Sequence, residues 1–200
     1  MMIIDLTMEI DERTPVFPGD PKPDIRQAAT IDKDGWNEKR LTFNSHFGTH
    51  IDAPFHMLPE GKKLTDFPPE RFIGEAVVID ARGQDEIDSN LEAVKEGDIV
   101  FFFTGYSDNV SGDYFEGGPV ITSATAGKLV EKKAKIVGLD SWTPDKAPYD
   151  VHKMLFRNDI LIVENLVNLG RLIGRRFECF VLPLKIRDAD GAPCRVIARL

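Results

Sequence analysis

The sequence SHFGTHIDAPFH at residues 45–56 contains three of the four histidines of the 200-residue chain. Histidine or aspartate alternates with apolar residues over much of this stretch, so an extended backbone would direct the two kinds to opposite faces. Gly48 and Pro54 argue against a helix here. One face would carry His46, His50, Asp52 and His56, and the other would carry Phe47, Thr49, Ile51, Ala53 and Phe55.

The polar face of this stretch has the composition of a metal site. A straight strand would separate His46 from His50 by about 13 Å at about 3.3 Å per residue, so the backbone must bend near Gly48 if both imidazoles are to reach one ion. His50 and Asp52 are only two residues apart, and imidazole with carboxylate is a ligand mixture that zinc or manganese accepts. The alternative is a half-exposed strand whose polar face happens to hold histidines.

A second pair of ligand-type residues lies further along the chain, at His152 and Glu164. Glu164 follows an apolar run at residues 160–163, so its carboxylate is expected at a strand end, where burial would require a partner. A surface glutamate that begins a turn is an equally good interpretation, and a lone histidine more often serves packing or a hydrogen bond. Spacing alone does not join residue 152 to residue 56.

Short apolar runs on either side of the histidine-rich stretch predict buried strands. They lie at residues 76–79, 99–103, 136–139 and 160–163. Residues 3–10 also predict a strand, whereas the prolines of residues 14–21 predict a rigid loop. Near the end of the chain, residues 180–186 alternate in polarity, turn at 188–191 and return as 194–198, which predicts a hairpin.

Two segments have helical character, residues 89–95 and 122–133. In the second, Ala124, Leu129 and Val130 are expected inside, and Glu131, Lys132 and Lys133 outside. Strands that alternate with helices, with hairpins at both ends, predict an α/β fold built on a mixed β-sheet or barrel with flanking helices. No repeat or linker divides the chain, so residues 1–200 are expected to form a single domain.

The composition excludes several classes of protein. Hydrophobic residues make up 42% and charged residues 29% of the chain, which is too apolar for intrinsic disorder. The net charge of −8 has the wrong sign for a nucleic-acid partner. No apolar run approaches the roughly 20 residues that span a bilayer, and the acidic start lacks the basic region of a signal peptide. We therefore expect a cytoplasmic protein with neither a membrane nor a nucleic-acid partner.

The sequence resembles the metal-dependent cyclase family, which includes bacterial-type kynurenine formamidases and isatin hydrolases, over nearly its whole length. The most specific element is the pattern H-x-G-T-H-x-D-x-P-x-H, which is matched at every position from His46 to His56. The supporting elements are TPVFPGDP at 14–21, VGLDSWTPD at 137–145, His152 followed by Glu164, and ADGAPCRVIA at 189–198.

The resemblance implies a swivelling β/β/α-type fold and hydrolysis of a carbon–nitrogen amide bond in a small aryl formamide or cyclic amide. It also implies the metal ligands: His46, His50 and Asp52 would bind a first divalent ion, and Asp52 would bridge to a second ion held by His152 and Glu164. Zinc is expected, as one or two ions, and manganese is the alternative. A divalent ion lowers the pKa of bound water to about 7.

His56 would then be the acid/base residue, because an imidazole that titrates near 6.5 can move a proton to the leaving amine. Ligand chemistry alone leaves open that His56 is a fourth ligand of the first metal. Kynurenine formamidases typically carry tryptophan in the PVWPGD loop, where it contacts the substrate. Phe17 stands at that place, and we expect it to line the substrate pocket. Thr49 replaces the alanine usual before the second histidine.

Members of the family commonly assemble as dimers or tetramers, which implies a homodimer or homotetramer here. The expected partner is a small-molecule amide substrate. Two other function classes stay open on the sequence: a non-catalytic protein that binds metal or a small ligand on the same scaffold, and a cyclase or dehydratase that uses the metal as a Lewis acid.

Overall fold

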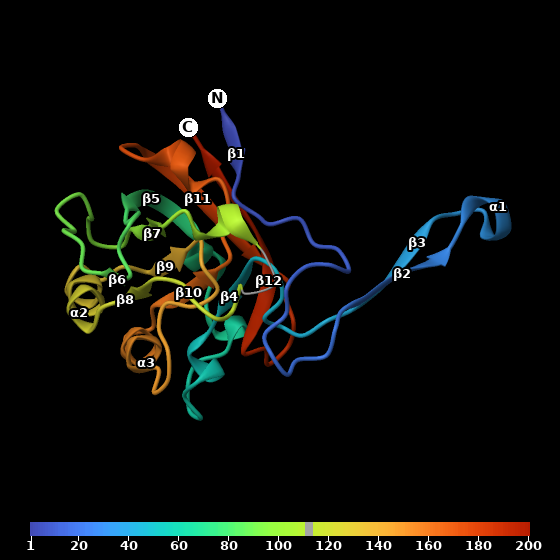
Figure 1. Ribbon diagram of the computed structural model, residues 1–200, viewed down its shortest axis with the longest axis horizontal. Coiled ribbons are helices and arrows are strands. Elements are labelled where there is room, and N and C mark those ends of the chain that lie inside the picture. Colours follow the sequence, from blue (N-terminus) through green and yellow to red (C-terminus); the bar gives the residue numbers. More distant parts are fainter. Residues whose placement is uncertain (111–113) are drawn as a thin grey trace.

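The computed structural model describes residues 1–110 and 114–200. An eight-stranded mixed sheet closes on itself because β12 pairs with β4 as well as with β11, which makes a seven-stranded barrel with β1 attached outside it (Figure 1). In order around the sheet the strands are β1 (Ile3–Asp5), β12 (Gly191–Arg199), β11 (Arg176–Pro183), β5 (Ile73–Asp80), β7 (Ile99–Phe103), β9 (Ile136–Leu139), β10 (Leu161–Glu164) and β4 (His50–Asp52).

Strands β5, β7, β9 and β10 are parallel, and their side chains are buried on both faces. Phe101 of β7 packs in the cluster that fills the barrel, and Phe102 packs in a second cluster outside it. A strand covered on both faces has no polar side, which is why these strands are continuous apolar runs in the sequence. The four buried strands predicted from the sequence are therefore confirmed.

Two helices cover the outer cluster, α2 (Ser123–Glu131) and α3 (Asp150–Arg157). Leu129 of α2 and Leu155 of α3 are buried there with residues of β7, β9 and β10. Thr122, directly before α2, is its N-cap residue: the Thr122 hydroxyl accepts a hydrogen bond from the Thr125 amide at 3.1 Å. Among residues 1–110 and 114–200, no helix has the length and apolar character to cross a bilayer.

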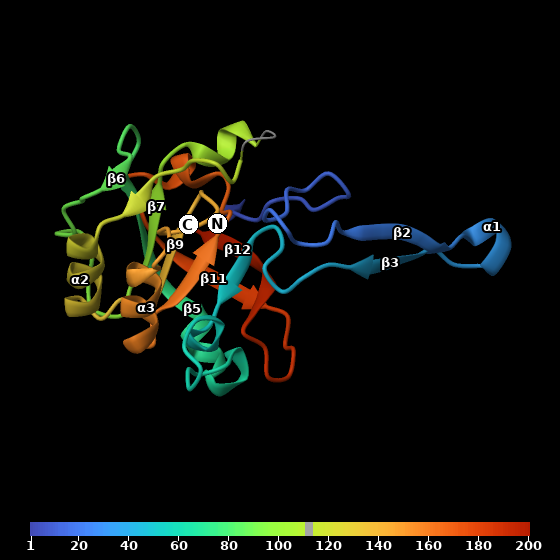
Figure 2. The same cartoon turned by 60° about the horizontal axis from the view of Figure 1, so that its bottom comes forward.

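An arm projects from the barrel, as Figures 1 and 2 show. It consists of β2 (Asp24–Ala29) and β3 (Glu38–Thr42), paired antiparallel, with the short helix α1 (Ile31–Asp34) at its tip. The smaller elements are β6 (Glu86–Ile87), which pairs with β8 (Val120–Ile121), and single-turn 3₁₀ helices at Pro54–His56, Leu64–Asp66, Pro69–Phe72, Tyr106–Asn109 and Leu169–Leu172.

The predicted C-terminal hairpin is confirmed as β11 and β12, with six residue pairs from Glu178–Arg199 to Pro183–Cys194. The strand predicted at residues 3–10 is shorter than expected and ends at Asp5. The Asp5 carboxylate accepts from the Thr7 amide at 3.1 Å, so a local turn replaces the ladder after this point.

The helix predicted at residues 89–95 is wrong: the segment forms turns. The Asn90 side chain accepts from the Glu92 amide at 2.9 Å, and so short a segment gains too little from helix formation to offset its nucleation cost. In α2, Ala124 is exposed, whereas Thr125, Ala126 and Leu129 form the buried stripe. The sequence analysis missed α3, which has only two turns.

Candidate metal centre

The histidine-rich stretch at residues 46–56 contributes the short strand β4 (His50–Asp52) to the barrel, where it lies between β10 and β12. His50 is opposite Glu164 of β10, and Asp52 is opposite Gly191 of β12. The backbone bends at Gly48, whose φ of +60° is a conformation that glycine adopts without strain. A Cβ at this position would lie 2.6 Å from the Ile10 side chain. The bend expected from the sequence therefore occurs at the expected residue.

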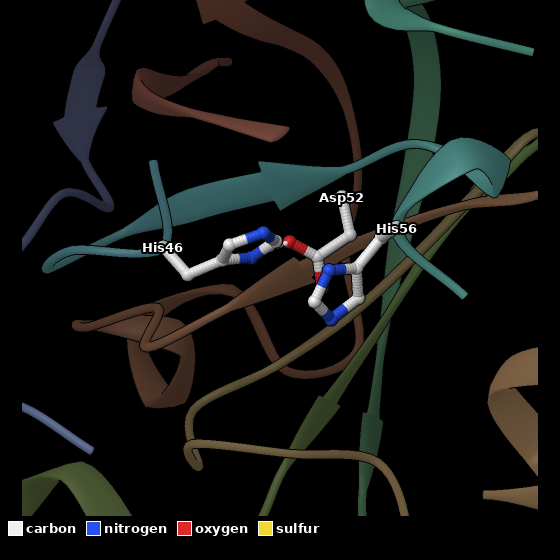
Figure 3. Close-up of side chains that lie close together, drawn as sticks. All are labelled: His46, Asp52 and His56. Atoms are coloured by element: carbon white, nitrogen blue, oxygen red, sulfur yellow. Dashed lines mark ion pairs between the residues drawn. The ribbon is translucent and has the colours of Figure 1, made fainter. Parts of the chain in front are cut away.

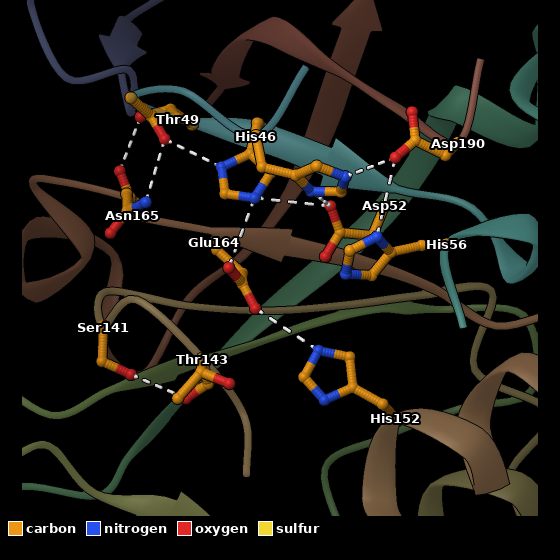
Figure 4. A network of polar contacts seen from close by, with 12 residues as sticks. His46, Thr49, Asp52, His56, Ser141, Thr143, His152, Glu164, Asn165 and Asp190 are labelled. Carbon is orange, nitrogen blue, oxygen red and sulfur yellow. Dashed lines mark hydrogen bonds and ion pairs between the residues drawn. The ribbon is translucent and has the colours of Figure 1, made fainter. Parts of the chain in front are cut away.

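The bend brings His46 back over Asp52, with Nδ1 2.7 Å from Oδ1. On the other side of Asp52, His50 Nε2 lies 3.3 Å from Asp52 Oδ1 and 3.3 Å from Glu164 Oε2. His152 Nε2 is 3.5 Å from Glu164 Oε1. The strand β10 and the helix α3 thus bring Glu164 and His152 to the residues of β4, as Figure 4 shows.

Two groups of side chains have the spacing of a cation site, and Asp52 belongs to both. The first comprises His46, Asp52 and His56 (Figure 3), and the second His50, Asp52 and Glu164. This grouping differs from the ligand sets that the resemblance implies, since it places His56 rather than His50 beside His46. The sharing of Asp52 agrees with a bridging carboxylate.

The residues of the centre fit a divalent cation. His50 Nε2 and Asp52 Oδ1 are buried, and neither makes a hydrogen bond of ordinary geometry within residues 1–110 and 114–200, although His46 Nδ1 and His50 Nε2 lie 2.7 and 3.3 Å from Asp52 Oδ1. A buried nitrogen and a buried carboxylate oxygen without such bonds are costly. Coordination to a metal would satisfy both atoms, and nitrogen and oxygen are donors that zinc binds.

The outward-facing nitrogen of each predicted histidine ligand is held by an acceptor. His50 Nδ1 donates to the Gly48 carbonyl at 3.0 Å, and His46 Nε2 donates to Asp190 Oδ2 at 2.8 Å. His152 Nδ1 donates to the Asp145 carboxylate. Such bonds fix the orientation of each ring, so the nitrogen that faces the centre is the one that would give up its proton and offer its lone pair to a bound metal.

The electrostatic field of the centre favours positive charge. Although burial opposes the imidazolium form, the Asp52 and Asp190 carboxylates raise the pKa of His46 to about 11. Burial likewise opposes the charged form of His152, but Asp145 and Glu164 raise its pKa to about 9. Burial lowers the pKa of His56 below its usual 6.5. His56 is therefore the histidine of the site that is held neutral.

The centre opens into a cavity of about 470 Å³. Aromatic side chains also line it: Phe17, Phe115 and Trp142, and Tyr149, whose ring lies 5.9 Å from that of His152 between centroids. The Phe17 ring packs against Phe115 at a centroid distance of 5.8 Å and against Trp142 at 5.9 Å. Phe17 belongs to the proline-rich loop expected from the sequence, and that loop reaches the centre across the cavity.

The structure brings His46, His50, Asp52, His56, His152, Glu164 and Phe17 to this one cavity. Phe55 departs from the expected alternation: it is 37% exposed, because the chain turns into a 3₁₀ helix at Pro54. The sequence analysis missed Asp145, Asn165 and Asp190. Asp145 and Asp190 lie in the motifs WTPD and ADGAP, but an acid next to proline or glycine is ordinarily a surface turn residue.

Asn165 directly follows Glu164 and connects several parts of the site. Its side-chain amide donates to the Gly48 carbonyl at 2.9 Å and accepts from the Tyr114 hydroxyl at 2.7 Å. Its φ of 58° lies in the left-handed region, which asparagine tolerates better than most residues. The amide thus supports the carbonyl that in turn holds His50.

The family model described as "Putative cyclase" matches residues 4–146. Curated relatives include the kynurenine formamidase of Bacillus cereus, which is 31% identical over 98% of this chain and 96% of that protein. The kynurenine formamidase of Erythrobacter litoralis is 32% identical over 98% of this chain and 93% of that protein.

Solved structures share the fold. Isatin hydrolase A from Labrenzia aggregata superposes with a TM-score of 0.89 at 24% identity, over 98% of this chain and 93% of that one. A protein described as a predicted metal-dependent hydrolase from Bacillus stearothermophilus superposes with a TM-score of 0.83 at 29% identity, over 98% and 97% of the two chains. The predicted α/β fold with a mixed barrel and flanking helices is therefore confirmed.

Proposed function

This chain belongs to the cyclase family and is a metal-dependent amide hydrolase, and we propose that its substrate is a small aryl formamide or a small cyclic amide. The observation that carries the proposal is that a wall of packed aromatic rings, from Phe17, Phe115 and Trp142, lines the same cavity as the metal centre. An aryl group packs favourably against such a wall, and its amide would then face the polar side of the cavity.

The residues proposed to hold the metal are His46, His50, Asp52, His152 and Glu164, with Asp52 shared between two positions. We propose zinc, as one or two ions, because nitrogen and carboxylate donors with no thiolate suit it, and manganese is the alternative. A bound divalent ion supplies Lewis acidity and a water of lowered pKa.

His56 is proposed to move the proton. Its ring lies at the cavity, 4.0 Å from the His46 ring and 6.4 Å from the His152 ring between centroids. A neutral imidazole accepts the proton of the attacking water and then donates it to the leaving nitrogen when the carbon–nitrogen bond breaks. A formamide gives an amine and formic acid as separate products, whereas a cyclic amide gives one ring-opened product with both groups, and one water is consumed in either case.

The test of the function uses protein stripped with a chelator and reloaded with Zn²⁺ or Mn²⁺. Hydrolysis of N-formylkynurenine or isatin should depend on the metal, and elemental analysis should find it in stoichiometric amount. A protein that retains metal but hydrolyses no amide or lactam would instead be a binding protein. Ring closure or loss of water without amide cleavage would indicate a cyclase or dehydratase.

The role of His56 is tested by His56→Ala. An acid/base residue contributes about 10²–10⁴-fold to turnover, so the variant should lose that factor while its metal content stays at the wild-type value. Loss of the metal together with the activity would show that His56 is a ligand, as its place beside His46 and Asp52 also permits.

We also propose that the protein acts in the cytoplasm as a homodimer or homotetramer, with a small-molecule amide as its partner and no membrane or nucleic acid. The arm supports the assembly: Ile31, Trp36 and Leu41 are 62%, 59% and 53% exposed, and apolar side chains gathered on a projecting element favour association. Light scattering should give a dimer or tetramer for the wild type and a smaller species for Ile31→Ser/Trp36→Ser. A monomeric wild type would contradict the proposal.

A further inference from the structure

We propose that Asp190 is a positioning residue that serves two histidines of the site at once, His46 in the metal centre and His56 in proton transfer. The inference rests on the proposed function, and it extends that function to a residue outside the ligand set. Asp190 belongs to the turn that precedes β12, far in sequence from both histidines.

One oxygen of Asp190 faces both rings. Asp190 Oδ2 accepts from His46 Nε2 at 2.8 Å and lies 3.6 Å from His56 Nδ1, as seen in Figure 4. The contact with His46 is a hydrogen bond. The contact with His56 is too long for a hydrogen bond, but it becomes an ion pair when His56 is protonated. The two rings are stacked at a tilt of 39° with centroids 4.0 Å apart. Both rings therefore depend on the same carboxylate.

The backbone fixes Asp190 relative to the centre. Its carbonyl accepts from the Ala53 amide at 2.8 Å, and the next residue, Gly191, pairs with Asp52. A Cβ on Gly191 would lie 2.8 Å from His46 Cε1 and 2.9 Å from the Ile51 carbonyl oxygen. Glycine at this position thus lets the His46 ring lie close over the strand and within reach of Asp190.

The chemical consequence differs for the two rings. Because His46 donates from Nε2 to Asp190, its Nδ1, which faces Asp52, is the nitrogen that would bind a metal, and an anionic acceptor strengthens such a nitrogen as a ligand. For His56, the carboxylate favours the proton on Nδ1 and stabilises the imidazolium formed during proton transfer. Asp190 would then act on metal affinity through His46 and on turnover through His56.

The test compares Asp190→Asn with Asp188→Asn, a matched control from the same turn. Asp188 is 63% exposed at its side chain and pairs with Lys63 at 2.9 Å, away from the centre. Zinc affinity of the metal-free proteins is measured by competition with a chromophoric chelator. Removal of a carboxylate that orients a histidine ligand costs about 10–100-fold in metal affinity. We expect that loss for Asp190→Asn and wild-type affinity for Asp188→Asn.

The second measurement is the split between kcat and KM for zinc-saturated protein on the amide that the wild type hydrolyses. Asp190→Asn should lower kcat at least tenfold with KM nearly unchanged, and Asp190→Glu, which restores the carboxylate, should recover part of kcat. Wild-type zinc affinity and kcat in a folded Asp190→Asn protein would overturn the proposal. If neither the Asn nor the Glu variant folds by circular dichroism, the role is structural and the proposal is also wrong.

The two measurements separate this inference from the proposed function. Zinc affinity is measured without substrate. A wild type that hydrolyses no amide would therefore refute the proposed function. The role of Asp190 in orienting His46 would still be supported if Asp190→Asn binds zinc more weakly than the wild type. A wild type that hydrolyses amides, with an Asp190→Asn variant that equals it in both measurements, would refute the inference alone.

Discussion

Asp52 is the residue on which the metal centre depends most, because it belongs to both groups of possible ligands and its buried Oδ1 lies 2.7 Å from His46 Nδ1 and 3.3 Å from His50 Nε2. We predict that Asp52→Asn abolishes metal retention and activity, since the neutral amide removes the shared negative charge. Glu164→Gln should weaken only the position shared with His50 and His152 and so retain part of the metal. Elemental analysis checks both variants, and equal metal content in Asp52→Asn and wild type would contradict the bridging role.

Phe17 is the aromatic residue that the N-terminal loop adds to the cavity. Aromatic pairs contribute about 0.5–1.5 kcal/mol beyond area burial, so Phe17→Ala should lower kcat/KM on an aryl substrate about two- to tenfold, mainly through KM. Its metal content should equal that of the wild type, because Phe17 contributes no atom to either group of possible ligands. Unchanged kinetics on the true substrate would show that the loop does not bind it.

At the scale of elements, the short strand β4 owes its placement to the bend at Gly48. An alanine there would keep φ near +60° and bring Cβ to 2.6 Å from Ile10, which costs about 1–2 kcal/mol for the backbone and more for the contact. We predict that Gly48→Ala lowers the free energy of unfolding in urea by about 2–4 kcal/mol on these two costs.

Gly83→Ala is the matched control for that prediction. Gly83 has a φ of +75°, and nothing lies within 4 Å of its ideal Cβ. Gly83→Ala should therefore lower the free energy of unfolding only by the cost of the positive φ, about 1–2 kcal/mol. If the two variants lose the same stability, the contact with Ile10 is not what requires glycine at position 48.

Helix α3 shows how one residue can serve an element and the site together. The Asp145 carboxylate accepts from the Val151 and His152 amides at 2.7 and 3.3 Å and also from the His152 ring. The Asp145 carboxylate thus satisfies free amides at the start of α3 and also orients His152, the predicted metal ligand on this helix. The start of α3 and the direction of His152 are therefore set by the same side chain.

At the scale of the whole molecule, the closure of the barrel holds the ligands from β4, β10 and α3 together, so a metal bound there should bind only the folded chain. Such binding stabilises the native state by about 2.7 kcal/mol at a metal concentration of 100 Kd, and about 2–4 °C of Tm accompanies each kcal/mol at this chain length. We predict that a chelator lowers Tm by about 5–10 °C on these two relations.

Calorimetry with and without chelator measures this shift, and Asp52→Asn is its control. The Tm of Asp52→Asn should be the same with and without chelator, because this variant retains no metal to lose. A chelator effect of the same size in both proteins would place the stabilising ion elsewhere.

Local sequence patterns specify the buried strands, the C-terminal hairpin and the bend at Gly48, because hydrophobic period, turn residues and glycine act over a few neighbouring residues. They also single out His46, His50, Asp52 and His56, since their spacing within one stretch is a local property. The same local rules failed at residues 89–95, where an asparagine side chain and a short segment favoured turns, and at α3, whose acceptor Asp145 lies outside the helix.

The meeting of distant residues follows from the packing of the strands and helices. The pairing of β4 with β10 and β12 brings Glu164, Asp190 and the β4 ligands to one cavity, and α3 adds His152. These contacts join residues more than 100 positions apart, such as His46 and Asp190. A carboxylate in a turn looks the same in the sequence whether it faces only solvent or a histidine, and the difference arises only when the barrel closes and brings the histidines of a distant segment to that side chain.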